Sequence, residues 1–143
     1  MNSILIKTVK YQAEIAAIRE IRTKVFQQEQ GVPLELEFDG LDDTSVHLLA
    51  YLNGKAVGTC RIRKIDVNTV KIERLAVLSE ARGQGIGKQL MEKALTVSQV
   101  DKSLVIVHAQ EYIAKLYQQL GFKIIGEKFN EAGIVHVKMI KQL

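Results

Sequence analysis

Residues 70–95 place a strand, a glycine-rich turn and a helix in direct succession, and few folds accommodate that unit. Residues 70–78 read VKIERLAVL, a β-branched and apolar run that is typical of a buried strand. From Gly85 onward, apolar residues recur at steps of four and three, which predicts one face of a helix. The turn between them holds Gly83, Gly85 and Gly87. A helix N-terminus exposes unpaired N–H groups and the positive end of its dipole, so this unit predicts an anion site.

The spacing of the three glycines excludes two common phosphate sites. A P-loop needs four residues between its first glycine and Gly-Lys-Ser/Thr, whereas three residues separate Gly83 from Gly87, and Lys88 is followed by Gln89. The dinucleotide fingerprint Gly-x-Gly-x-x-Gly fails because the third glycine arrives one residue early. The remaining pattern is Arg-x-x-Gly-x-Gly, which begins at Arg82. This pattern resembles the acetyl-CoA pyrophosphate loop of the GCN5-related N-acetyltransferases, the GNAT family.

The strand of residues 70–78 changes its apolar phase near the middle. Val70 and Ile72 are apolar at even positions, whereas Leu75 and Val77 are apolar at odd ones. A β-bulge near Glu73 would produce this change and would leave backbone groups unpaired for a ligand. A central strand that is buried on both faces would need no alternation at all. Both interpretations stay open.

The other elements complete a mixed sheet. Helical spacing predicts helices over residues 13–30 and 111–120. Alternation and β-rich composition predict strands over residues 4–10, 47–52, 55–65, 103–108, 122–129 and 134–140. The order β-α-β-β-β-α-β-α-β-β predicts an α/β (α+β) fold with helices on the faces of a mixed sheet. The resemblance implies the GNAT fold, whose six- to seven-stranded sheet is mostly antiparallel.

Length and composition limit the classes of protein. A chain of 143 residues with 47% apolar content is expected to form one domain, residues 1–143. The net charge of +4 is too small and dispersed to indicate nucleic acid. One cysteine, Cys60, excludes an internal disulfide, and neither a leader nor a membrane span is evident. We therefore expect a cytoplasmic protein without a membrane, nucleic-acid or metal partner, and a homodimer stays open.

Two further patterns extend the resemblance to the family. Residues 114–122 resemble the family segment in which a tyrosine, here Tyr117, faces the CoA sulfur, although Leu116 stands where an aromatic residue is often found. Nearly the whole chain is also similar to the ElaA/YjcF-like subgroup of acetyltransferases. The positions that carry this similarity include Arg22, Glu37, Asp39, Arg61, His108 and His136. Similarity to this subgroup does not identify the acceptor of the acetyl group.

The resemblance implies a cofactor and a reaction. Acetyl-CoA would be the donor, and a primary amine of a small molecule or peptide would be the acceptor, with direct transfer in a ternary complex. The main chain of residues 75–77 would bind the pantetheine arm, and the glycine turn would bind the pyrophosphate. The implied CoA-binding residues are Leu75, Ala76, Val77, Arg82, Gly83, Gln84, Gly85, Ile86, Gly87 and Tyr117.

Three residues are candidates for proton transfer, and each has a plainer interpretation. Tyr117 is the candidate general acid for the leaving thiolate, or a core residue. Glu73 is the first candidate for the general base, or a salt-bridge partner of Arg74 or Lys71. His108 ends a strand and is the second candidate base, or a structural histidine.

The acceptor side is predicted from charge. The acidic segment of residues 34–43 either steers a cationic amine, through groups such as Glu37 and Asp39, or only solvates a surface. Arg22 and Arg61 either bind an acidic group of the acceptor or pair with this segment. His136 either lines the acceptor pocket or packs locally.

Two alternative functions remain beside N-acetylation. The N-terminal pattern is also similar to acyl-homoserine-lactone synthases, but this chain is short for that family and has no tryptophan. A non-catalytic acyl-CoA-binding module with the same fold is the other alternative. Thiol release with an amine tests for catalysis, and acyl-carrier protein with S-adenosylmethionine tests for lactone synthesis.

Overall fold

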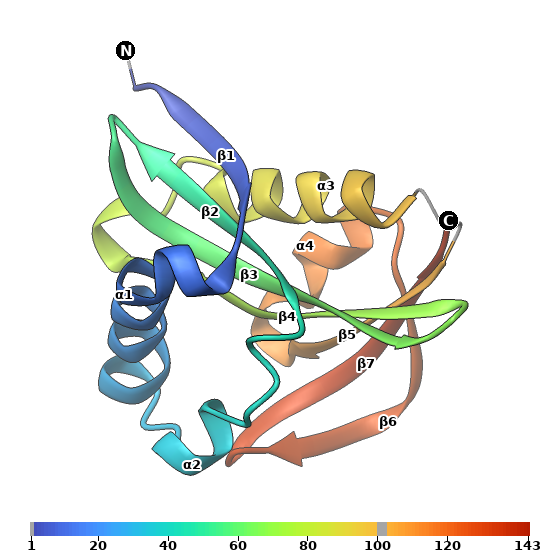
Figure 1. Cartoon of the computed structure of the whole chain (residues 1–143). Helices are drawn as coiled ribbons and strands as arrows, with labels where there is room; N and C mark the ends of the chain where they lie inside the picture. The colour runs from blue at the N-terminus through green and yellow to red at the C-terminus, as the bar shows by residue number, and fades with distance from the viewer. Residues whose placement is uncertain (1, 100–102) are drawn as a thin grey trace.

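The computed structural model describes residues 2–99 and 103–143. Seven strands form one sheet in the order β1-β2-β3-β4-β5-β7-β6 (Figure 1), and every adjacent pair is antiparallel except β4 with β5. The strands are β1 (Ile4–Val9), β2 (Val46–Leu52), β3 (Lys55–Asp66), β4 (Thr69–Val77), β5 (Leu104–Gln110), β6 (Lys123–Glu131) and β7 (Ile134–Gln142). The predicted fold class, a mixed and mostly antiparallel sheet flanked by helices, is confirmed.

The α-helices are α1 (Tyr11–Arg22), α2 (Leu34–Glu37), α3 (Ile86–Ser98) and α4 (Ala114–Gln119). The other helical segments are η1 (Thr23–Glu29) and the short 3-10 turns η2 (Ser79–Ala81) and η4 (Glu111–Ile113). The helix expected over residues 13–30 is therefore divided, because its second half, η1, is a π-helix. Its wider turn buries Val25 in the core and brings the neighbouring Phe26 to a cleft. No helix among the described residues is long and apolar enough to cross a membrane.

Helices cover both faces of the sheet (Figure 1). Helix α1 buries Ile18 and Ile21, and α3 buries Leu90 and Met91, while both helices contact β3 and β4. A Cβ atom at Gly58 of β3 would lie 3.0 Å from the Leu90 Cδ1 atom. Glycine at this position therefore lets α3 pack closely on the sheet, which fixes the helix that follows the glycine turn.

Strand β4 has the predicted β-bulge. Thr59 of β3 pairs with Ala76 and Arg61 pairs with Glu73, so Arg74 and Leu75 together stand opposite one residue of β3. Arg74 has a φ of 57°, which non-glycine residues rarely adopt. The bulge explains the change of apolar phase, and the interpretation as a strand buried on both faces is wrong because Leu75 and Val77 are only partly buried.

The parallel pairing of β4 with β5 is short. It joins residues 69–71 of β4 to residues 104–106 of β5. Past this point, Ile72 and Leu75 of β4 and His108 and Gln110 of β5 line a common cleft. The two strands therefore diverge and leave backbone groups of β4 facing the cleft rather than a neighbouring strand.

Candidate active site

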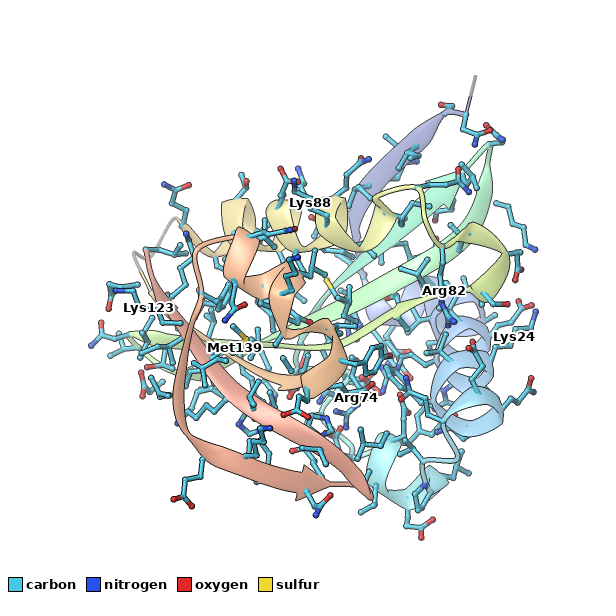
Figure 2. All side chains as sticks on the ribbon, turned by 180° about the vertical axis from the view of Figure 1, so that it is seen from behind. Lys24, Arg74, Arg82, Lys88, Lys123 and Met139 are labelled. Carbon is cyan, nitrogen blue, oxygen red and sulfur yellow. The ribbon has the colours of Figure 1, made fainter. Side chains whose placement is uncertain are left out.

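The cleft between the diverging strands has a volume of about 430 Å³. Strands β4 and β5 form its floor, η1 and α2 one side, and the β6–β7 hairpin and α4 the other. Figure 2 shows Arg74, which also lines the cleft, in the view from behind. The cleft brings together the predicted site residues Glu37, Asp39, Glu73, Leu75, His108, Tyr117 and His136.

The glycine turn lies at the surface beyond the cleft. Gly83 and Gly85 have φ values of 81° and 77°, and Gly85 is the N-cap of α3. The first helical bond runs from the Gln89 N–H to the Gly85 carbonyl at 3.0 Å. The N–H groups that precede Gln89 therefore lie outside the helical ladder, where they can bind an anion. Arg82 already donates to Glu29 at 2.7 Å and to the Val77 carbonyl at 3.0 Å.

Gly87 indicates that this surface is shaped for a ligand. It lies in the first turn of α3 with an ordinary negative φ, and a Cβ atom there would meet only Val77 Cγ2, at 3.9 Å. Glycine inside a helix costs about 0.5–1 kcal/mol relative to alanine. Neither backbone conformation nor packing in this protein explains that cost, whereas close approach of a phosphate does. The turn therefore has room for a phosphate group.

We expect Gly87→Ala to separate stability from binding. The melting temperature should rise slightly, by the equivalent of about 0.5–1 kcal/mol, because alanine favours the helix. The affinity for CoA should fall roughly tenfold, because the methyl group occupies the approach of the phosphate. Calorimetry and a thermal scan on one preparation measure both. The exposed Glu92→Ala on the same helix is the control and should keep full affinity; an unweakened Gly87→Ala would remove the ligand explanation.

Tyr117 on α4 lies at the other end of the floor. Its side chain is 5% exposed, lines the cleft and packs edge-on against Phe122 with ring centroids 5.8 Å apart. Burial raises the pKa of the Tyr117 hydroxyl well above its ordinary value. The phenol therefore keeps its proton at neutral pH and can donate it within the cleft. It is both a core residue and a cleft residue, so the two sequence interpretations do not exclude each other.

Glu73 is surrounded by cations. Arg61 Nε lies 2.8 Å and Arg63 Nε 2.9 Å from its Oε2 atom, and Lys71 lies 3.5 Å from Oε1. Burial acts to raise the pKa of Glu73, but the hydrogen bond from Arg63 and the charge of Arg61 outweigh it and lower the pKa to about 2. Such a carboxylate is a weak base. The geometry favours the salt-bridge interpretation, although its main partners are Arg61 and Arg63 rather than Arg74.

The lowered pKa of Glu73 makes a prediction about acid stability. Because the folded pKa, about 2, lies below the ordinary value of 4.5, the ion pairs stabilise the fold fully above about pH 5. That contribution, about 3 kcal/mol, should disappear as the pH falls from 4.5 toward 2. Urea unfolding at a series of pH values measures it. Glu73→Gln should show a flatter acid dependence, and an unchanged dependence in this variant would contradict the assignment.

The acidic segment belongs to an internal ion-pair cluster. Arg22 binds Asp42 at 2.7 Å, and Arg61 binds Asp42 at 3.0 Å and Asp39 at 2.8 Å. The Arg22 side chain also pairs with Glu37. We call Arg22, Glu37, Asp39, Asp42, Arg61 and Glu73 the ion-pair cluster. Because most charges of the segment are neutralised inside the protein, the solvated-surface interpretation does not describe it, and steering of a cation has little charge left.

The ion-pair cluster also shows which of the two interpretations holds for Arg22 and Arg61. The side chains of Arg22 and Arg61 are each 1% exposed, so they support the wall of the cleft and do not reach an acceptor. Of the two interpretations from the sequence, the structure supports the one in which both arginines pair with the acidic segment. Arg74 reinforces it from the bulge by donating to the carbonyls of Leu36, at 3.2 Å, and Glu37, at 3.1 Å.

One carboxylate oxygen of the ion-pair cluster has no hydrogen-bond partner among the described residues. It is the Oε2 atom of Glu37, which is buried. A buried carboxylate oxygen without a partner is costly unless a donor reaches it. Glu37 lines the cleft, but its side chain is only 2% exposed, so this oxygen lies inside the wall of the cleft.

His108 and His136 face the cleft from β5 and β7, and Glu131 at the end of β6 lies between them. The His108 Nδ1 atom is 3.2 Å from Glu131 Oε1, and His136 Nε2 is 3.6 Å from Oε2. The Phe129 ring contacts both imidazoles. Sequence patterns indicated site roles for the two histidines but none for Glu131, because only the pairing of β6, β7 and β5 brings the three together.

Other cleft residues were also absent from the predicted site. Arg63, Lys71 and Arg74 supply charge, while Leu36 and Tyr112 supply exposed apolar surface at 54% and 74% exposure. A cross-strand register for β3 and β4 could have found Arg63 opposite Lys71. Several predicted residues lie outside the cleft: Arg22, Arg61, Ala76, Val77, Arg82, Gly83, Gln84, Gly85, Ile86 and Gly87. Among the described residues, no group of acidic, histidine or cysteine side chains is arranged to hold a metal ion.

A sheet that opens beside a β-bulge, with a glycine turn before α3 and a buried phenol in the cleft, is the arrangement of an acyltransferase fold of the GNAT type. The profile of the acetyltransferase (GNAT) domain matches residues 7–143. The chain belongs to the GNAT acetyltransferase family.

Three similar proteins place the chain within that family. The uncharacterized N-acetyltransferase YjcF of Bacillus subtilis is 39% identical over 124 residues, which cover 85% of this chain and 87% of YjcF. The crystal structure of Escherichia coli ElaA has a TM-score of 0.87 at 29% identity and covers 98% of this chain and all of ElaA. An acyl-CoA N-acyltransferase from Pseudomonas aeruginosa has a TM-score of 0.85 at 31% identity and covers 97% of this chain and 99% of its own. The resemblance to the ElaA/YjcF-like subgroup is confirmed.

Proposed function

We propose that this protein is an acetyl-CoA-dependent N-acetyltransferase that acts on a primary amine of a small molecule or peptide. The observation that carries the proposal is the cleft itself, which opens where β4 leaves β5 and contains Tyr117 and His108. The exposed glycine turn at the start of α3 supports CoA as the carrier. We further propose that residues 1–143 act as one domain, in the cytoplasm.

Bound acetyl-CoA would supply the thioester, whose carbonyl carbon bonds to the amine nitrogen as its C–S bond breaks. The N–H groups at the start of α3 hold the pyrophosphate, and the main chain of β4 at Leu75 holds the arm beside the cleft. Tyr117 donates its proton to the sulfur. His108 accepts the proton that the amine nitrogen loses, because a neutral imidazole in the cleft carries a lone pair for it, whereas Glu73 is held ionised by its arginines.

The acceptor is placed by the remaining polar groups of the cleft. Asp39, whose side chain is 27% exposed, can accept a hydrogen bond from the acceptor, and His136 lines the side opposite. The exposed apolar side chains of Leu36 and Tyr112 receive its carbon skeleton. The pocket thus suits a compact amine with both polar and apolar parts.

A thiol-release assay with acetyl-CoA and a panel of primary amines tests the proposal. Release that depends on the amine, with one acetyl group gained by the product in mass spectrometry, is the expected result. CoA binding without any amine-dependent release would instead support a non-catalytic binding module. Release only with acyl-carrier protein and S-adenosylmethionine would support the lactone-synthase alternative.

A further inference from the structure

Glu131 lies against two cleft histidines. Its Oε1 atom lies 3.2 Å from His108 Nδ1, and its Oε2 atom lies 3.6 Å from His136 Nε2. The Phe129 ring meets His108 edge-on at 5.1 Å and stacks on His136 at 5.8 Å. The carboxylate is thus hydrogen-bonded to His108, and both imidazoles pack on one aromatic ring.

The partners determine which ring nitrogens carry protons. A carboxylate only accepts hydrogen bonds, so His108 donates through Nδ1 and keeps a lone pair on Nε2 when its ring is neutral. His136 donates through Nδ1 to the Ile134 carbonyl at 2.7 Å, which leaves its Nε2 atom facing Glu131. Of the two histidines, His108 is therefore the one with a nitrogen that is not engaged by these contacts.

We propose that Glu131 is a positioning residue that orients His108, so that the Nε2 atom of His108 accepts the proton of the acceptor amine in the cleft. The proposal rests on the proposed function and adds a residue to it. The ammonium form of the acceptor loses one proton to Nε2, and the resulting imidazolium is stabilised by the Glu131 carboxylate until it releases the proton to water. The amine nitrogen is then neutral and carries the lone pair that attack requires.

A structural role explains Glu131 poorly. It is the last residue of β6, the edge strand of the sheet, and its side chain is 47% exposed, so it contributes little to the core. The hydrogen bond from His108 lowers the pKa of Glu131, so the carboxylate stays ionised over the range in which a histidine titrates.

The other charges around His108 do not replace this anion. Lys138 stands opposite His108 on β7, and Lys71 lies across the cleft on β4. Both are cations. Glu73, another carboxylate of the cleft, is neutralised by Arg61 and Arg63. Loss of the Glu131 charge should therefore act directly on His108.

Nuclear magnetic resonance can test the contact without any substrate. The chain has three histidines, so their ring signals can be assigned with His108→Gln and His136→Gln variants. In Glu131→Gln the ring nitrogen signals of His108 should report a smaller share of the Nδ1–H tautomer, because Nδ1 loses the carboxylate that accepts from it. Glu127→Gln, on the same strand but outside the cleft, is the matched control and should leave that share unchanged. An unchanged tautomer in Glu131→Gln would overturn the proposal.

Kinetics test the positioning role with the best amine of the panel. Glu131→Gln should lower kcat/KM for the amine about tenfold and move the acidic limb of its pH profile, because the imidazolium of His108 loses its anionic partner. KM for acetyl-CoA and the melting temperature should not change, and Glu131→Asp should recover part of the rate. An unmoved limb or an unaltered rate would overturn the proposal. If no amine releases thiol from the wild type, the proposed function fails. The nuclear magnetic resonance comparison still decides whether Glu131 sets the state of the His108 ring.

Discussion

Replacing Tyr117 by phenylalanine is expected to lower kcat by roughly 10²–10⁴-fold, or about 3–5 kcal/mol in activation free energy. The departing sulfur develops negative charge, and the buried Tyr117 hydroxyl, whose pKa is raised by burial, is protonated and able to donate. Phenylalanine keeps the ring and its edge-on contact with Phe122. CoA affinity should therefore change little. Steady-state kinetics and a thermal scan on one preparation measure both effects.

Tyr112 provides the matched control. It also lines the cleft, but its side chain is 74% exposed at the surface, so Tyr112→Phe should leave kcat within about twofold of the wild type. If Tyr117 served only the core, Tyr117→Phe would lose about 1 kcal/mol of stability and keep near-normal turnover. That result would leave the acid for the leaving thiolate unassigned.

Replacing Gly85 by aspartate is expected to abolish CoA binding in the accessible concentration range. Gly85 caps α3, and nothing in the protein lies within 4 Å of a Cβ atom there, so the new carboxylate would project into the space of the phosphates. Two like charges about 4 Å apart near a protein surface repel by about 4 kcal/mol, or roughly a thousandfold in Kd. Calorimetric titration with CoA measures the loss.

Gly85→Asn separates charge from backbone strain. Asparagine and aspartate have the same shape and tolerate the left-handed conformation of Gly85, φ 77°, to a similar degree. The asparagine variant should share any loss of stability but keep measurable CoA affinity. Equal affinity in the aspartate variant and the wild type would show that the phosphates bind elsewhere.

The elements of this fold were predictable because each has a local cause. The Asn53-Gly54 turn, where both residues have positive φ values, specifies the β2–β3 hairpin. The phase change of β4 indicated the bulge at Arg74. The structure of the acidic segment was harder to predict from the sequence. Helix α2 is only four residues long, and it depends on long-range contacts such as those from Arg74 to the Leu36 and Glu37 carbonyls.

The candidate site was only partly predictable for the same reason. Motif resemblance indicated Tyr117 and the glycine turn, which are short, contiguous patterns. The partners of Glu73 and His108 come from other strands, and their pairing depends on register that the sequence does not specify. Glu131 is separated from His108 by 23 positions and becomes its partner only when β7 pairs with both β5 and β6.

Because of the ion-pair cluster, the two walls of the cleft differ in how well they tolerate substitutions. Removing one member, for example Arg61, would leave buried charges without a partner and would lower the stability of the fold by about 3–5 kcal/mol. Libraries that vary this wall would therefore mostly yield unfolded proteins. Where β6 turns into β7, Ala132 and Ile134 reach the cleft, and neither belongs to the ion-pair cluster. A change of acceptor preference is therefore most accessible through that turn, where variation alters pocket shape while the scaffold stays intact.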